Sequence, residues 1–308
     1  MLGAAGAGRP GCTHNVCVMS RAQAGLRIAS LPERLPPPSL FVMGAISQYV
    51  GSALAVLLFA SVPAAGVAWL RVVASAGVLV AWRRPWRARW PAARLWLVAA
   101  FGLTLALMNL TFYLALDRLP LGTTVAIEFC GPITVAALGS RTRRDLLALT
   151  LAVAGVAALT DVHIAGSPGG LALAAGAGVL WAGYVVLGHR LAADRAVSSQ
   201  DGLAVGMAIG AVVLAPALVP HAVPAFESPP LLAACIAVGI ASSVVPYALE
   251  QIAMRRLPRA RFALLLALLP ATAAIIGAII LGQVPGVLEA VGIALIVAAA
   301  SLRSHAEQ

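Results

Sequence analysis

The chain has 308 residues, of which 61% are hydrophobic and 10% are charged, and its mean hydropathy is +0.95. Soluble domains carry roughly 25% charged residues, so this composition excludes a water-soluble globular protein. The formal charge of +10 does not indicate a nucleic-acid-binding protein, because the basic residues stand in short loops between apolar runs and form no basic face with aromatic or polar readers.

In chain order, residues 1–39 contain no long apolar run and are expected to form a disordered cytoplasmic extension. Ten apolar runs follow, each near the length of about 20 residues that crosses a lipid hydrocarbon core. Each run must be helical, because an open backbone in lipid leaves its N–H and C=O groups without partners. The predicted spans are 41–61, 64–82, 95–116, 121–140, 146–160, 170–187, 202–219, 231–251, 262–281 and 286–302. Residues 303–308 are expected to form a short cytoplasmic tail.

The arginines predict how the chain is oriented in the membrane. All 21 basic residues are arginine. If the N-terminus is cytoplasmic, nineteen of these 21 fall on the cytoplasmic side, Arg118 falls on the other side, and Arg71 lies inside the second span. Cytoplasmic loops of membrane proteins carry an excess of Lys and Arg. The sequence therefore predicts a multi-pass protein of the inner membrane with both termini in the cytoplasm.

An internal repeat divides the predicted helices into two groups of five, residues 40–161 and 162–302. Matching residues recur at an offset of 138 or 137, and each stands at the same point of the five-helix unit. The matches are Arg118-Leu119-Pro120 with Arg256-Leu257-Pro258, Pro132 with Pro270, Gly139 with Gly277, and Gly155 with Gly292. Because five is odd, the second copy enters from the opposite side. We therefore predict an all-α integral membrane fold of ten transmembrane helices in two inverted repeats, a recurrent plan of secondary transporters.

Arg71 and Glu128 are the charges placed most firmly inside predicted spans. A charged side chain at that depth costs at least a few kcal/mol, roughly, unless it is paired or faces a wet cavity, so both are expected to point inward. They can simply neutralise each other or fix helix packing. Alternatively, Arg71 binds a substrate carboxylate, and Glu128 binds an ammonium group or a coupling proton.

Glu128 precedes Pro132 by four residues, with Gly131 between them, so the helix there can lose a backbone hydrogen bond and expose carbonyls. A proline kink by itself is usually only a kink. Pro270 in the partner segment strengthens the prediction of a helix break at Gly131, Pro132 and Pro270 near a midplane site.

Six further residues complete the predicted substrate or proton site. Glu250 lies near the cytoplasmic end of the eighth span, where it can equally pair with local arginines. The others are polar or aromatic residues within spans, for which packing or interface roles are the common alternative. They are Asn109, Tyr113, Trp181, Tyr184 and Tyr247.

Catalytic chemistry is not indicated. The sequence has no Gly-rich phosphate loop, no GxSxG and no HExxH, and its acidic residues are too few for a metal-dependent lipid-phosphate transferase. No Cys/His cluster has metal-ligand spacing. We therefore expect neither an enzyme nor a bound metal or cofactor. A channel is harder to exclude, because a pore also needs inward polar groups.

Several short segments between residues 41 and 302 resemble the EamA-type branch of the drug/metabolite transporter superfamily, and within it the threonine/homoserine exporter group. The matching segments are Pro85-Trp86-Arg87, Asn109 with Phe112-Tyr113-Leu114, Pro120-Leu121-Gly122, Val125-Ala126-Ile127-Glu128-Phe129 with Gly131-Pro132, Gly176-Ala177-Gly178 with Trp181, Pro246-Tyr247 with Leu249-Glu250, and Arg256-Leu257-Pro258. The block around Glu128 is the most specific. Two positions depart from the group, which tends to carry acids where this chain has Leu269 and Gln283.

This resemblance implies a ten-helix exporter of small amino acids or related metabolites, driven by the proton-motive force through alternating access. The expected partners are a small solute, protons and the lipid bilayer, with no nucleic acid, and the oligomeric state is left open between a monomer and a homodimer. Two alternatives stay open. One is an EamA transporter of a different solute, such as a drug, nucleoside or sugar-linked metabolite, and the other is a structural or lipid-handling membrane protein without transport.

Overall fold

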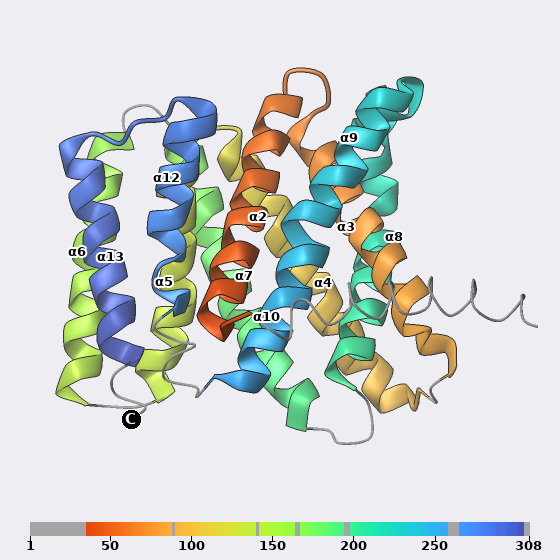
Figure 1. Ribbon diagram of the computed structural model, residues 1–308, viewed down its shortest axis with the longest axis horizontal. Helices are drawn as coiled ribbons and strands as arrows, with labels where there is room; N and C mark the ends of the chain where they lie inside the picture. Colours follow the sequence, from red (N-terminus) through yellow and green to blue (C-terminus); the bar gives the residue numbers. More distant parts are fainter. Residues whose placement is uncertain are drawn as a thin grey trace, which may run out of the picture.

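The computed structural model describes residues 35–87, 90–139, 142–163, 167–193, 198–257 and 265–304, and the regular secondary structure of these ranges is helical (Figure 1). The apolar runs form the helices, and Gly, Pro and Arg residues are frequent where one helix ends and the next begins. The helices are α2 Pro37–Leu58, α3 Ala64–Arg83, η1 Pro85–Arg87, α4 Ala92–Leu116, α5 Leu121–Gly139, α6 Arg143–His163, α7 Pro168–Ala193, α8 Ser199–Glu227, α9 Pro229–Gly239, η2 Ile240–Val244, α10 Val245–Arg256, α12 Leu269–Leu281 and α13 Val287–Ser304.

Six stretches of the described residues are long and apolar enough to cross a membrane. They are Pro37–Leu58, Ala64–Arg83, Arg94–Leu116, Pro168–Leu191, Gln200–Glu227 and Pro229–Leu249. Four shorter apolar helices accompany them, namely Leu121–Val135, Leu146–Leu159, Leu269–Leu281 and Val287–Leu302. Each of these ten stretches overlaps one predicted span, and α2 begins at Pro37, inside the segment expected to be an extension. Residues 1–34 and 305–308 lie outside the described ranges.

The prolines at the predicted helix breaks lie in two different local structures. Helix α5 continues on both sides of Pro132, which stands inside it. Helix α12 instead begins at Leu269, directly after a turn at residues 267–268, so Pro270 occupies its first turn. A proline fits the first turn of a helix because the N–H that it lacks has no intrahelical partner there.

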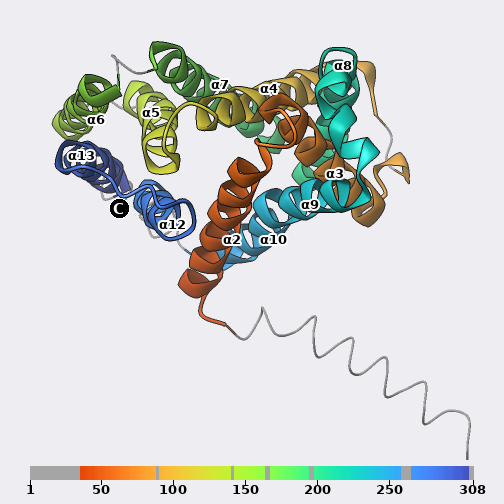
Figure 2. The ribbon, with the colours of Figure 1, turned by 90° about the horizontal axis from the view of Figure 1, so that it is seen from above.

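The helices form two rows that join at both ends (Figure 2). One row runs through α5, α7, α4 and α8, and the other runs through α12, α2, α10 with α9, and α3. Helices α6 and α13 pack together at one end of the molecule, and α3 packs on α8 at the other. Each row therefore contains helices from both halves of the sequence.

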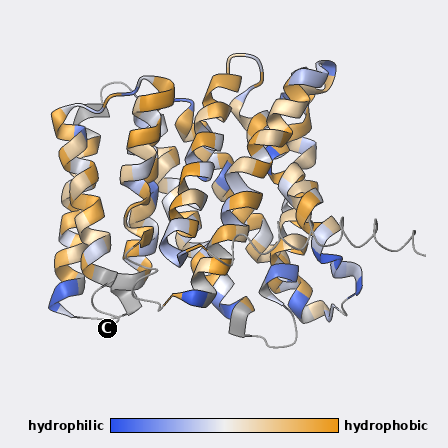
Figure 3. Ribbon diagram, in the orientation of Figure 1, coloured by the Kyte–Doolittle hydropathy of each residue, from blue (hydrophilic) through white to orange (hydrophobic). Residues whose placement is uncertain are grey.

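Large apolar side chains cover the outside of these rows. Val212 is 72% exposed and Ile279 is 73% exposed. In Figure 3 hydrophobic residues occupy most of the length of the helices, whereas many of the hydrophilic residues gather at the helix ends. Soluble monomers rarely expose contiguous apolar patches of this extent. This surface suits lipid along its middle and water at its two ends.

Glycines let helices approach closely across the interior. Lipid tails are as apolar as the helix side chains, so the hydrophobic effect does not drive helices together inside a membrane. Close backbone contact therefore supplies much of the packing energy. A methyl group on Gly131 of α5 would overlap the carbonyl of Gly178 on α7. Equivalent contacts join Gly102 of α4 with Gly206 of α8, and Gly155 of α6 with Gly292 of α13.

We expect Gly131→Ala to destabilise the protein by about 1–3 kcal/mol, because the added methyl must push α5 away from α7. The measurement is the thermal unfolding midpoint in detergent. Gly176→Ala is the matched control, since a methyl group there meets nothing within 4 Å. This substitution also raises the helix propensity of the position by about 1 kcal/mol. Equal midpoints for the two variants would contradict this account of the α5–α7 contact.

Candidate functional site

Arg71 lies in the interior of the helix bundle, on α3, and only 6% of its surface is exposed. Its Nε donates to the hydroxyl of Ser243 at 2.9 Å, and its Nη2 donates to the carbonyl of Ser242 at 3.0 Å. Its guanidinium carbon is 5.1 Å from the centre of the Tyr113 ring, within range of a cation–π interaction. Neutral acceptors and one aromatic face thus hold this cation.

The acceptors of Arg71 come from an irregular turn between α9 and α10. Residues Ile240–Val244 form one π-helical turn, a feature that is frequent at functional sites. Pro246 follows Ser242 by four residues and has no N–H, so it cannot give the Ser242 carbonyl the usual helical hydrogen bond. That carbonyl is therefore available to Arg71. Sequence reasoning missed both serines, although two hydroxyls four and three residues before a proline in an apolar run were a usable signal.

Ser75, one turn after Arg71, fixes the backbone of α3 against α9. Its hydroxyl lies 2.7 Å from the carbonyl of Arg71 and 3.2 Å from that of Gly239. A methyl group on Gly239 would come within 3.0 Å of the same Arg71 carbonyl. The glycine therefore permits the close contact that brings the serine turn within reach of the guanidinium.

Glu128, on α5, is the second buried charge, with 7% of its surface exposed. Among the described residues, no hydrogen bond or salt bridge to its carboxylate is recorded, so its oxygens are more than 4.0 Å from the nitrogens of Arg71. The two residues do not form the direct pair that was one expectation for them.

Small and aromatic residues of α7 pack around Glu128. A methyl group on Gly178 would come within 2.9 Å of the Glu128 carbonyl, so α7 passes directly over this point of α5. Pro132 follows Glu128 by four residues and cannot donate to that carbonyl. One turn along α7, Trp181 packs edge-on against Phe129, with ring centres 5.2 Å apart. Trp181 therefore packs against the residue that follows Glu128 on α5.

Tyr113 is fully buried, and among the described residues its hydroxyl has no hydrogen-bond partner. The hydroxyl of Ser52 on α2, which is 1% exposed, is in the same situation. Leaving a buried polar group unpaired costs about 1–3 kcal/mol, and each such group in a folded protein needs an explanation. Beside Arg71, a free phenol hydroxyl is suited to a polar solute.

The remaining predicted site residues are distributed differently. Asn109 on α4 is buried and donates to the carbonyl of Leu105 in its own helix at 2.8 Å. Tyr184 on α7 stacks on Phe101 with ring centres 5.0 Å apart. Tyr247 is half-buried in the first turn of α10. Glu250 belongs to α10, but its side chain lies outside the described part of the structure.

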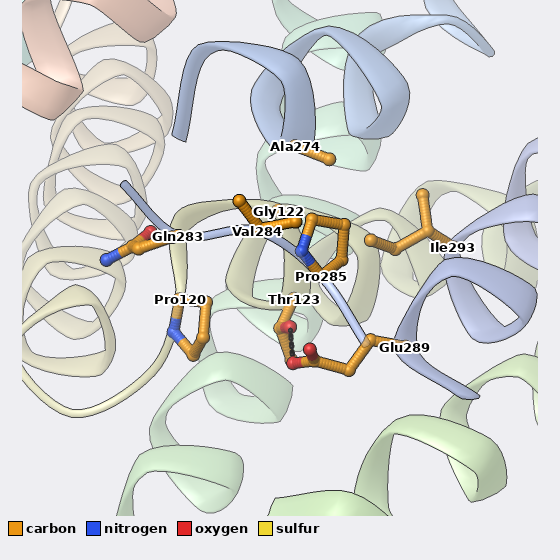
Figure 4. A pocket seen from close by; sticks show the side chains of 9 residues that line it. All are labelled: Pro120, Gly122, Thr123, Ala274, Gln283, Val284, Pro285, Glu289 and Ile293. Atoms are coloured by element: carbon orange, nitrogen blue, oxygen red, sulfur yellow. Dashed lines mark hydrogen bonds between the residues drawn. The ribbon is translucent and has the colours of Figure 1, made fainter. Parts of the chain in front are cut away.

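A second polar group lies at the end of the bundle where α12 connects to α13, around a cavity of about 110 Å³ (Figure 4). Gln283 accepts a hydrogen bond from the backbone N–H of Leu121 at 2.9 Å. Glu289, which is buried, accepts from the N–H of Gly286 at 2.8 Å and from the hydroxyl of Thr123 at 3.3 Å. These bonds tie the loop to the start of α5, and Glu289 also caps its own helix.

The model of the EamA-like transporter family matches residues 168–304. A threonine/homoserine exporter RhtA from Salmonella typhimurium strain LT2 is 36% identical over 275 residues, which cover 87% of this chain and 91% of the relative. The protein of the same name from Escherichia coli strain K12 is 35% identical over 277 residues, covering 88% and 92%. A solved crystal structure of a protein aligns over 86% of this chain and 96% of its own, with a TM-score of 0.56 and 22% identity, which shows the fold alone.

We expect Ser243→Ala to lower stability by about 1–3 kcal/mol, because it leaves the Nε–H of buried Arg71 without its acceptor. The midpoint of thermal unfolding in detergent measures this loss. Thr150→Val is the matched control, because the exposed Thr150 hydroxyl serves only the carbonyl of Leu146 in its own helix. A loss no larger than that of the control would mean that the Arg71–Ser243 bond does not stabilise the fold.

Proposed function

Because the chain belongs to the EamA-like transporter family, we propose that it is a secondary active exporter of small amino acids of the threonine or homoserine kind. The two relatives are named as exporters of these solutes, which supports a role in membrane transport and not in catalysis. One observation carries the proposal beyond the family: Arg71 and Glu128 are both buried inside the bundle, and no salt bridge joins them in the described part of the structure.

A zwitterionic amino acid carries the two charges that complement this arrangement. The solute carboxylate binds the guanidinium of Arg71. In the structure this guanidinium donates to two neutral acceptors, and no carboxylate of the described residues cancels its charge. The ammonium group binds the carboxylate of Glu128. Tyr113, whose ring face lies against Arg71, supplies a further hydrogen-bonding group through its unpaired hydroxyl.

Proton coupling follows from the fact that Glu128 can hold one cation at a time. Either a proton or the ammonium group of the solute neutralises this buried carboxylate, and an empty, charged Glu128 is the costly state. A proton entering from outside therefore replaces the exported solute. Carboxyl groups inside membrane proteins commonly mark such proton relays.

We propose ten transmembrane helices in two inverted repeats, which alternate between inward-open and outward-open states. The packing supports this arrangement, since α4 lies on α7 and α8 while α9 and α10 lie on α2 and α3. Gly155 and Gly292, which match at an offset of 137, also face each other, and a methyl group on either would lie within 3.0 Å of the other's carbonyl. Such mutual contact is expected where two copies meet at a symmetry axis.

The orientation is proposed from charge. We place the chain in the inner membrane with both termini in the cytoplasm, since most arginines then lie on the cytoplasmic side. The start of α2 and the end of α13 lie at the same end of the bundle, which supports this placement (Figure 1).

Glu128→Gln should abolish proton-driven threonine efflux from proteoliposomes, because the amide can neither carry a proton nor balance an ammonium charge. Efflux is measured as loss of labelled threonine under an imposed pH gradient. Glu227→Gln is the matched control, since Glu227 is exposed at the end of α8. Full activity of the Glu128 variant would remove this residue from the mechanism.

The role proposed for Arg71 is tested with the substrate. Threoninol keeps the ammonium and hydroxyl groups of threonine but lacks its carboxylate, so we expect its efflux by the wild type to be lower by at least about 100-fold, the loss usual when a buried polar partner is left unpaired. Equal efflux of both compounds would disprove carboxylate recognition by Arg71.

The same assay with a panel of drugs, nucleosides and sugar-linked metabolites separates a different EamA solute from an amino acid. A structural or lipid-handling protein would show no solute flux under any gradient.

A further inference from the structure

The connection between α3 and α4 is described at residues 84–87 and again from residue 90. Helix α3 ends at Arg83 and is capped by Arg84, whose backbone is left-handed with φ 52° and ψ 53°. The short helix η1 follows at Pro85–Arg87, Pro85 is buried, and Trp90 donates its Nε1–H to the carbonyl of Pro85 at 2.9 Å. The backbone of this turn, Arg84–Arg87, is therefore shaped by the helix end, the short helix and the Trp90 bond.

The left-handed residue is an arginine where glycine would be the easier choice. Among the described residues, Arg84 is the one non-glycine residue with a positive φ. A residue with a Cβ pays roughly 1–2 kcal/mol in this conformation, and helices that end this way usually have glycine there. Backbone outliers of this kind point to a function for the side chain.

Exposed tryptophans lie at the end of α3, in η1 and near the start of α4. Trp82 in the last turn of α3 is 60% exposed, Trp86 in η1 is 64% exposed, and Trp96 in α4 is 79% exposed. Tryptophan gathers where a membrane meets water, because its ring is apolar and its N–H is polar. These three rings place the turn at the membrane surface.

The arginines of the turn differ in what they contact. Arg83 forms a salt bridge, since its Nε donates to the carboxylate of Asp201 on α8 at 2.9 Å. Arg84 and Arg87 are exposed, and no carboxylate partner is recorded for either within the described ranges. Two guanidinium groups thus remain available beside three interfacial tryptophans.

We propose that this surface, which we call the Arg–Trp turn, binds the headgroup of an anionic phospholipid such as phosphatidylglycerol. It consists of Trp82, Arg84, Trp86, Arg87 and Trp96. Guanidinium groups bind phosphate oxygens bidentately, while the tryptophan rings lie against the glycerol and upper acyl region. A zwitterionic lipid offers the same phosphate but adds a positive group that the arginines repel.

The experiment compares lipid retention by the purified full-length protein. The protein is equilibrated in mixed micelles with equal amounts of phosphatidylglycerol and phosphatidylcholine of identical acyl chains, and retained adducts are counted by native mass spectrometry. We expect the wild type to retain phosphatidylglycerol in excess. Arg84→Gly and Arg87→Gln should each reduce that excess about fivefold, the factor for one cationic side chain at an anionic lipid surface.

Two controls make the result specific. Arg84→Gly should raise the thermal unfolding midpoint, because glycine accepts φ 52° without strain, so its loss of lipid cannot be attributed to misfolding. Arg190→Gln removes an exposed arginine from the end of α7 and should leave the excess unchanged. Equal retention of the two lipids by the wild type, or an equal loss in the Arg190 variant, would overturn the proposal.

Discussion

The rest of the structure is arranged around the need to keep the guanidinium of Arg71 charged inside a membrane-embedded bundle. An arginine at the centre of a transmembrane helix costs about 2.5–3.5 kcal/mol on insertion scales. Here the cost is reduced by the Ser243 hydroxyl, the Ser242 carbonyl and the Tyr113 ring. All three come from helices other than α3, so the charge is tolerable only when the bundle is assembled.

Proline and glycine make these contacts accessible. Pro246 and Pro132 each stand four residues after a site residue, Ser242 and Glu128, and each withholds the N–H that would normally occupy that residue's carbonyl. The glycines facing these places allow the neighbouring helix to approach within backbone contact. Irregular backbone of this kind is stable at membrane depth only when protein covers it.

The two buried charges behave as separate binding groups within one interior. A direct Arg71–Glu128 pair would have cancelled both charges and left little reason to bind a zwitterion. Because no ion pair joins them, each charge stays available for the opposite end of the proposed amino acid. The Arg–Trp turn, proposed to lie at the membrane surface, places further arginines directly after α3, the helix that carries Arg71 into the interior.

The sequence by itself determined the membrane environment, the approximate helix ranges and the two buried charges, because hydrophobic length and isolated charges are local properties of the chain. It also indicated the family through the segment around Glu128. Only the tertiary structure decided which groups meet Arg71, because Ser242 and Ser243 lie more than 170 residues away. It likewise separated Arg71 from Glu128 and tied Gln283 and Glu289 to the start of α5. Such partners depend on how distant helices pack, and no local pattern specifies that.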